Sequence, residues 1–118
     1  AHAGGVIVQI AERRQGDIVV LCPEGRIDND TSATFQDRLL ATVGIEGASV
    51  VLDLAKVDYI SSAGLRALMM ASKQAKATKG RIGVAALGPV VKEIFAISRF
   101  SYVVPVFETT AAAAAAWR

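Results

Sequence analysis

The sequence predicts an α/β domain with a mixed, mostly parallel sheet of about five strands and four helices. Short apolar runs rich in β-branched residues alternate with segments whose apolar residues recur every three or four positions. The first two apolar runs adjoin across a polar turn, which favours an antiparallel hairpin. With 118 residues, 53% of them hydrophobic, the chain suits a single folded core.

The first strands and helix are predicted from simple patterns. Val6–Ile10 and Asp17–Cys22 are apolar, with a polar turn over Glu12–Gly16 between them. Pro23 cannot donate to a sheet and marks an edge or a bulge, after which Gly25–Ile27 resumes the strand. Helix-capping residues then precede an apolar repeat at four-residue spacing, which predicts an amphipathic helix with Phe35, Leu39 and Val43 on its buried face.

The second half of the chain alternates strands and helices. Ser49–Leu54 is a continuous apolar run, as in a buried parallel strand. The following helix presents one apolar face and ends at Gly80; the residues of that face are Leu65, Leu68, Met69, Ser72 and Ala75. The remaining predicted elements are a strand at Ile82–Ala86, a helix from Pro89, a strand or extended segment at Tyr102–Phe107 and a helix at Ala111–Ala116 capped by Thr109 or Thr110.

The residue inventory argues against an enzyme. One histidine and one cysteine cannot build a Ser-His-Asp or Cys-His site, and they leave a structural zinc without ligands. Cys22, within an apolar run, is expected to be a small buried hydrophobe. The net charge of +2 gives no support for nucleic-acid binding. We therefore expect no catalytic residues, no metal and no cofactor.

Localisation and boundaries are expected from the same composition. No segment approaches the roughly 20 apolar residues that span a bilayer, so direct membrane insertion is not expected. The start lacks the pattern of a secretory signal, and a cytoplasmic location is the default expectation. Residues 1–5 are predicted to be a flexible tail and 6–118 a single domain.

Asp53 and Asp58 flank the end of a predicted strand and admit two interpretations. They could bind a divalent ion, although strand-end carboxylates more often accept hydrogen bonds from loop amides. Asp53 could also be a phosphoacceptor of the response-regulator type. That chemistry needs an acidic pair after the first strand and a lysine near the fifth strand. Here the first strand leads into Glu12-Arg13-Arg14, and no lysine follows Lys92.

The stretch "VDYISSAGLRAL" places two serines at a predicted strand-to-helix junction. Ser61 or Ser62 can cap the helix by accepting a backbone N–H bond. The same helix N-terminus also suits a phosphate, because its unpaired N–H groups carry partial positive charge. Gly64 lacks a side chain beside this position and is expected to let a partner approach closely.

The predicted second helix also has a mixed cationic and apolar side. Arg66, Met70 and Lys73 follow Ser62 at spacings of four, four and three residues, away from the predicted buried face. A solvated charged face and a protein-binding patch both remain open, the latter because methionine adapts to different partners.

Three segments together resemble the STAS domain, and more narrowly the bacterial anti-sigma factor antagonists. They are "GRIDNDTSATFQDRLL" (Gly25–Leu40), "VVLDLAKVDYISSAGLRALMMASKQAK" (Val50–Lys76) and "VVPVFETTAAAAAAW" (Val103–Trp117). The resemblance implies a STAS-like fold and a switch. An unphosphorylated antagonist binds an anti-sigma factor, often a serine kinase of the histidine-kinase-like ATPase fold, and phosphorylation of a loop serine releases it. A metal-dependent serine phosphatase resets the switch.

The resemblance also assigns roles within the loop. The family commonly has Asp-Ser-Ser-Gly-Leu, so alignment on Gly64 makes Ser62 the expected phosphoacceptor, with Ser61 as the alternative. Ser61 stands where the family has aspartate, and Ala63 where it has a second serine. The expected partner-binding residues are Asp28, Asn29, Ser61, Ser62, Ala63, Gly64, Arg66, Met70 and Lys73. The alternative function is a non-phosphorylated STAS scaffold or an accessory subunit of a stress-signalling or membrane transport complex.

Overall fold

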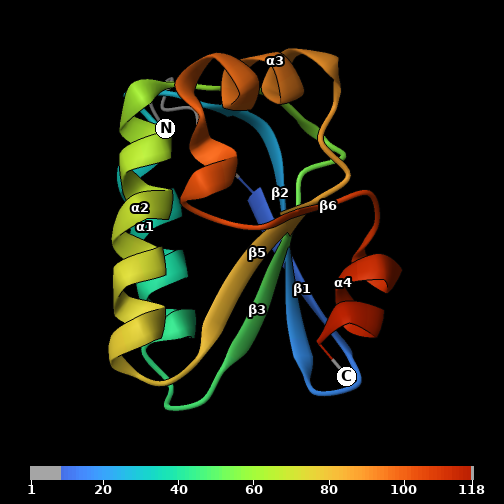
Figure 1. Cartoon of the computed structure of the whole chain (residues 1–118). Helices are drawn as coiled ribbons and strands as arrows, with labels where there is room; N and C mark the ends of the chain where they lie inside the picture. Colours follow the sequence, from blue (N-terminus) through green and yellow to red (C-terminus); the bar gives the residue numbers. More distant parts are fainter. Residues whose placement is uncertain (1–8, 118) are drawn as a thin grey trace.

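The computed structural model describes residues 9–117, whose path is drawn in Figure 1. The strands in this part of the chain are β1 (Gln9–Gln15), β2 (Ile18–Ile27), β3 (Ser49–Asp53), β4 (Val57–Ile60), β5 (Arg81–Ala85) and β6 (Val106–Phe107). The helices are α1 (Ser32–Val43), α2 (Ser62–Ala77), α3 (Pro89–Ser98), the short 3-10 turn η1 (Phe100–Tyr102) and α4 (Thr110–Ala116).

The strands form one mixed sheet in the order β1-β2-β3-β5-β6, with β4 paired to β2 beside this path. Among the strands of residues 9–117, only β1 and β2 pair antiparallel, and the other paired strands are parallel. Helices α1 and α2 lie side by side along one face of the sheet, α4 lies on the other face, and α3 crosses one end (Figure 1). The predicted fold class is therefore confirmed, with β4 as an additional strand.

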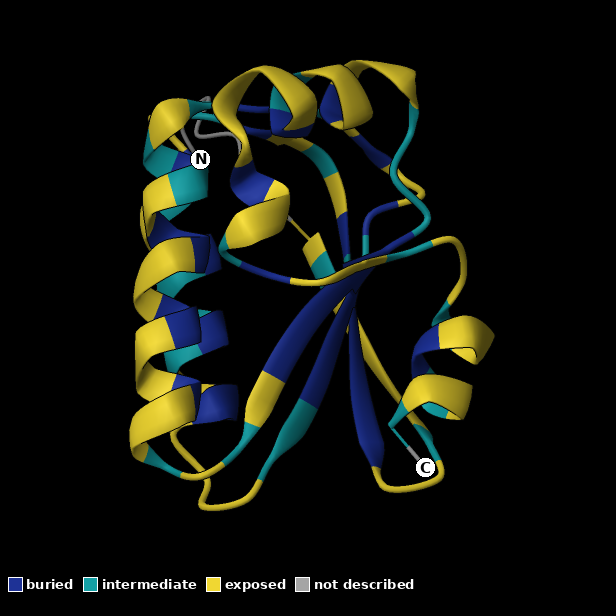
Figure 2. Cartoon of the chain, in the orientation of Figure 1, coloured by how far each residue is buried: buried dark blue, intermediate teal, exposed yellow. Residues whose placement is uncertain are grey.

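The core follows the alternation of side chains along the central strands (Figure 2). Leu21, Val50 and Leu52 belong to the larger buried cluster, which also contains the inner sides of α1 and α2. Val20 and Val51 point to the opposite face, where Ala113 of α4 covers them. Both faces of the central strands are thus buried, which explains their continuous apolar sequence.

Strand β2 changes its parallel partner half-way along its length. It pairs with β3 as far as Leu21, and with β4 from Gly25 onward. Pro23 lies between the two pairings, where its missing N–H costs no parallel sheet bond. Gly25 has φ +95° and lies at a register shift, a left-handed conformation that favours glycine. This bend carries the end of β2 toward β4 and the start of α2.

Several predicted boundaries were wrong. The first strand extends through Gln15, so the charged residues expected to form the turn lie in β1. This is possible because β1 pairs on one side only, with β2, and its side chains are largely exposed. Tyr102 lies in η1, and only Val106–Phe107 of the predicted last strand pairs with β5. Val6–Val8 and the predicted tail lie outside the described residues.

Cys22 is half-buried, contrary to the expectation of a buried hydrophobe. Arg13 donates to its Sγ at 3.0 Å, and also contacts Asp53 Oδ2 at 3.5 Å and Thr110 Oγ1 at 3.3 Å. Burial raises the pKa of the Cys22 thiol, although Arg13 acts in the opposite direction. Arg13 therefore connects β1, β2, β3 and α4 on the face opposite α1 and α2.

Candidate functional site

Two neighbouring strand ends place the candidate loop. Ile27 of β2 and Ile60 of β4 are parallel partners, so the residues that follow them emerge together at one edge of the sheet. The backbone N–H of Ser61 donates to the Ile27 carbonyl at 2.8 Å. Asp28 and Ser61, which are 33 positions apart, are thereby brought next to each other.

The two serines have different environments. Ser61 is the N-cap of α2, with extended backbone (φ −88°, ψ 174°), and its Oγ accepts from the Gly64 N–H at 3.3 Å. Ser62 is the first residue of the helix and is exposed. The capping role thus belongs to Ser61, which leaves the Ser62 hydroxyl accessible in the first turn of α2.

This difference predicts unequal effects on stability. Ser61→Ala removes the cap and is expected to lower the free energy of unfolding by about 1 kcal/mol. Ser62→Ala, at an exposed position, is expected to change it by less than about 0.5 kcal/mol. Urea denaturation of both variants beside the wild type measures the difference. Equal losses would contradict the assignment of the cap to Ser61.

Asp28 holds its own loop together. Its Oδ1 accepts from the N–H groups of Asp30 (3.0 Å) and Thr31 (3.3 Å), and its Oδ2 lies 3.7 Å from Arg26 Nε. Asn29 is exposed at the tip of this loop. The Asp28 carboxylate therefore fixes the loop beside Ser61, and the exposed tip is what the loop presents outward.

Gly64 serves packing. It is buried, and a Cβ added to it would lie 2.6 Å from Ile60 Cγ1 and 2.8 Å from Ile27 Cγ2. The expectation that the missing side chain opens space for a partner is wrong, because that space is filled by the core. Glycine instead lets the first turn of α2 approach the ends of β2 and β4. This close approach positions Ser61 and Ser62 at the start of the helix.

Gly64→Ala is expected to lower the free energy of unfolding by about 1–2 kcal/mol. Overpacking against the two isoleucines outweighs the gain in helix propensity, which is about 1 kcal/mol. Gly88→Ser is the matched control, because Gly88 is the N-cap of α3 and nothing lies within 4 Å of its added Cβ. Urea denaturation compares them; an unchanged or raised stability of Gly64→Ala would contradict the packing role.

A shallow groove of about 540 Å³ runs beside Ser62 along α2. It brings together four of the predicted partner-binding residues: Ser62, Arg66, Met70 and Lys73. Leu65 and Met69 of α2, together with Ser98 and Phe100 beyond it, complete the lining. The other predicted positions (Asp28, Asn29, Ser61, Ala63 and Gly64) lie outside this lining, in or next to the loop at its serine end.

Sequence reasoning placed Met69 on the buried face of the helix, which is wrong. Met69 is 39% exposed and Met70 is 42% exposed, so two adjacent methionines face outward. Leu68 and Ala75 of the same predicted face are buried. Helical periodicity does not assign a residue at the border between two faces to either face. The two adjacent methionines at this border were the available sign of an exposed apolar surface.

Asp53 has a structural contact at the end of β3. Asp53 Oδ1 accepts from the Ala55 N–H at 3.0 Å, which is the loop-amide role expected of a strand-end carboxylate. Asp58 is exposed. Over residues 9–117 no three metal-ligating side chains cluster in a way that would hold an ion. Across the same stretch, none of the helices is both long enough and apolar enough to cross a membrane.

Comparison with known proteins identifies the family. The family model described as the STAS domain matches residues 9–113. A Bordetella bronchiseptica protein named "Putative anti-sigma factor antagonist BtrV" is 37% identical over 101 residues, which cover 86% of this chain and 87% of that protein.

Solved structures agree on the fold. An anti-sigma factor antagonist from Mycobacterium paratuberculosis superposes with a TM-score of 0.83, at 23% identity, covering 92% of each chain. The Bacillus cell fate determinant SpoIIAA in its phosphorylated form gives a TM-score of 0.66 at 14% identity, covering 94% of this chain and 99% of that one. Because the family model matches nearly the whole described chain and the sheet has the same architecture, this protein belongs to the STAS domain family.

Proposed function

We propose that this protein is an anti-sigma factor antagonist controlled by phosphorylation of Ser62. In its unphosphorylated form it binds an anti-sigma factor that is a serine kinase of the histidine-kinase-like ATPase fold, and the sigma factor is released. The kinase transfers the γ-phosphoryl group of ATP to Ser62, the complex dissociates, and a metal-dependent serine phosphatase removes the phosphate.

The different environments of the two serines support this proposal most directly. Ser61 caps α2, so Ser62 is left exposed at the first helical position. A hydroxyl there can enter a kinase without unfolding the domain. The product phosphate carries about −1.5 to −2 charges and would lie at the positive end of a helix, where an anion is stabilised.

The residues around Ser62 also offer a reason why phosphorylation would weaken binding to the anti-sigma factor. Arg66 lies one helical turn further along α2 and lines the same groove. A phosphate on Ser62 would attract this guanidinium within the same chain, and would place a dianion in the surface that contacts the partner. Arg66 would then be less available to the partner, and burying the remaining negative charge of the phosphate in the interface is unfavourable, so both effects favour dissociation.

The test is a competition with purified components. The anti-sigma factor kinase of the source organism is loaded with labelled sigma factor, and this protein is titrated in. The proposal predicts release of sigma by the unphosphorylated protein, loss of that release after incubation with ATP, and retention of release by Ser62→Ala under both conditions. A protein that never displaces sigma, while remaining folded, would overturn the proposal and favour a STAS scaffold.

A further inference from the structure

We propose that the groove beside α2 receives an acidic amphipathic helix of the anti-sigma factor, and that Arg99 and Tyr102, which are close in sequence to the lining residues Ser98 and Phe100, contact the same helix. This inference rests on the proposed function, since it specifies the partner chemistry of the same site. It adds to the predicted docking residues a segment between α3 and β6 that is distant from them in sequence.

The groove has an apolar floor and a cationic margin. Leu65, Met69 and Phe100 provide apolar surface, and Arg66 and Lys73 provide positive charge. None of the described residues that line the groove is acidic. The whole of α2 likewise carries Arg66, Lys73 and Lys76 but neither Asp nor Glu. A partner segment with carboxylates beside apolar side chains complements this surface in both charge and polarity.

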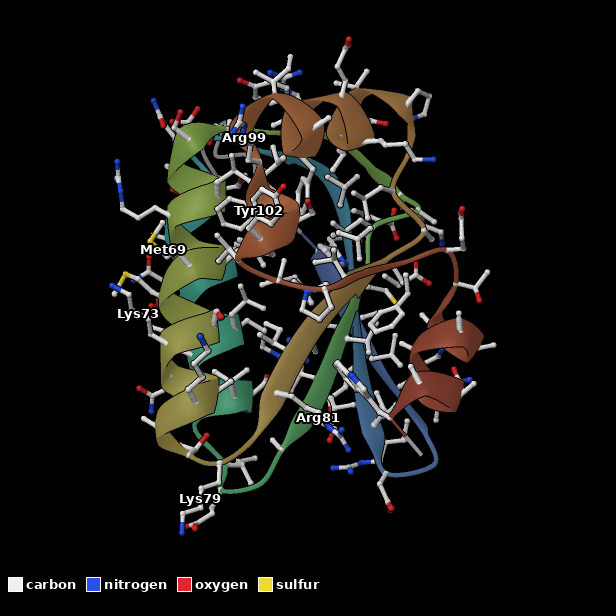
Figure 3. All side chains as sticks on the ribbon, viewed as in Figure 1. Met69, Lys73, Lys79, Arg81, Arg99 and Tyr102 are labelled. Atoms are coloured by element: carbon white, nitrogen blue, oxygen red, sulfur yellow. The ribbon has the colours of Figure 1, made fainter. Side chains whose placement is uncertain are left out.

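The second side comes from the end of α3 and from η1. Ser98 and Phe100 line the groove, and Arg99 lies between them. Tyr102, two residues further on, is 85% exposed. Figure 3 shows Arg99 and Tyr102 beside the upper, serine-bearing part of α2, to the right of the helix in this view. Aromatic and arginine side chains are the residue types most enriched at interface hot spots.

The backbone at Arg99 supports a role for its side chain. Arg99 caps the C-terminus of α3 with φ +55° and ψ +34°, the left-handed conformation usually occupied by glycine. This conformation is unfavourable for a residue that has a side chain. A strained backbone at the residue between Ser98 and Phe100, which line the groove, points to a function for that residue.

The groove dimensions suit a helix. The lining residues of α2 run from Ser62 to Lys73, and the eleven residue steps between them span about 16 Å at 1.5 Å per residue. This length matches about three turns of a partner helix lying between α2 and η1, with apolar anchors at i, i+3 or i+4 and i+7. Carboxylates on both flanks of that helix would meet Arg66 and Lys73 on one side and Arg99 on the other.

Lys79 provides a matched control for Arg99. It is also an exposed cation with a left-handed backbone (φ +62°), but it lies just beyond the opposite end of α2 (Figure 3). Arg99→Gly and Lys79→Gly each remove one positive charge and relieve the same kind of backbone strain. Neither variant is expected to lose stability, so thermal unfolding at or above the wild-type midpoint will show that binding changes do not come from misfolding.

The experiment measures the affinity of the wild type and the variants for the purified anti-sigma factor kinase at two salt concentrations. Arg99→Gly and Tyr102→Ala are expected to weaken binding about tenfold, and Lys79→Gly by less than about twofold. Arg99→Gly should also reduce the salt dependence of binding. If the wild type binds and neither Arg99→Gly nor Tyr102→Ala weakens binding, this inference is overturned and the proposed function is not. Absence of binding by the folded wild type would overturn the proposed function as well.

Discussion

Replacing Ser62 by aspartate is expected to weaken binding to the anti-sigma factor kinase about tenfold, and full phosphorylation about 100-fold or more. Aspartate adds one negative charge and phosphate nearly two, at a position that lines the docking groove. Ser62→Ala removes only a hydroxyl and is expected to bind within about threefold of the wild type. Isothermal titration calorimetry with the purified kinase, in the presence of ADP, measures all four affinities.

Thr110→Asp is the matched control for this experiment. Thr110 is the first residue of α4, as Ser62 is of α2, and α4 lies on the opposite face of the sheet. The new carboxylate gains the same helix dipole but lies away from the groove, so the affinity should not change. Equal binding by Ser62→Asp and Ser62→Ala would contradict an electrostatic switch at this position.

Substitutions at the adjacent residues Leu68 and Met69 are expected to have different large effects. One should lower stability, and the other should weaken binding to the kinase. Leu68 is fully buried, and Leu68→Ala is expected to lower the free energy of unfolding by about 3 kcal/mol. Met69 is 39% exposed and lines the groove, so Met69→Ala should cost less than about 1 kcal/mol of stability. Met69→Ala should instead weaken binding to the kinase about fivefold.

Urea denaturation and calorimetry of both variants test this pair. The expected pattern is one variant that loses stability and another that loses affinity. At temperatures where it remains folded, Leu68→Ala should bind nearly as well as the wild type. Substantial destabilisation by Met69→Ala, or unchanged affinity, would show that this methionine belongs to the core and not to the docking surface.

The central fold could be predicted because its residues are constrained locally. Val50, Val51 and Leu52 form an uninterrupted apolar run at the centre of a strand that is buried on both faces. Phe35 and Leu39 repeat at helical spacing and are fully buried in α1. In these segments local sequence and tertiary packing favour the same structure, so pattern reasoning was sufficient.

The missed elements depend on contacts that are distant in sequence. Val57–Ile60 is only four residues long and becomes a strand because the far half of β2 bends to pair with it. The charged residues of β1 form a strand because β2 provides a partner on one side. Neither pairing leaves a periodic signal in the short segment itself, which is why single-sequence reasoning could not find them.

The candidate site was predicted in part. Sequence and resemblance singled out Ser61, Ser62, Arg66, Met70 and Lys73, and the structure places the last four in one groove. They could not assign the cap to Ser61, since both serines can cap a helix, nor reveal that Gly64 packs on the core. The contribution of Ser98 and Phe100 was also out of reach, because it arises only when η1 folds back beside α2.

The most direct test of the proposed switch is to locate the phosphate on the protein. The protein is incubated with the purified anti-sigma factor kinase and ATP, and the modified position is mapped by peptide mass spectrometry in the wild type, Ser61→Ala and Ser62→Ala. We expect one phosphate, on Ser62, in the wild type and in Ser61→Ala, and none in Ser62→Ala. A phosphate on Ser61, or undiminished phosphorylation of Ser62→Ala, would contradict it.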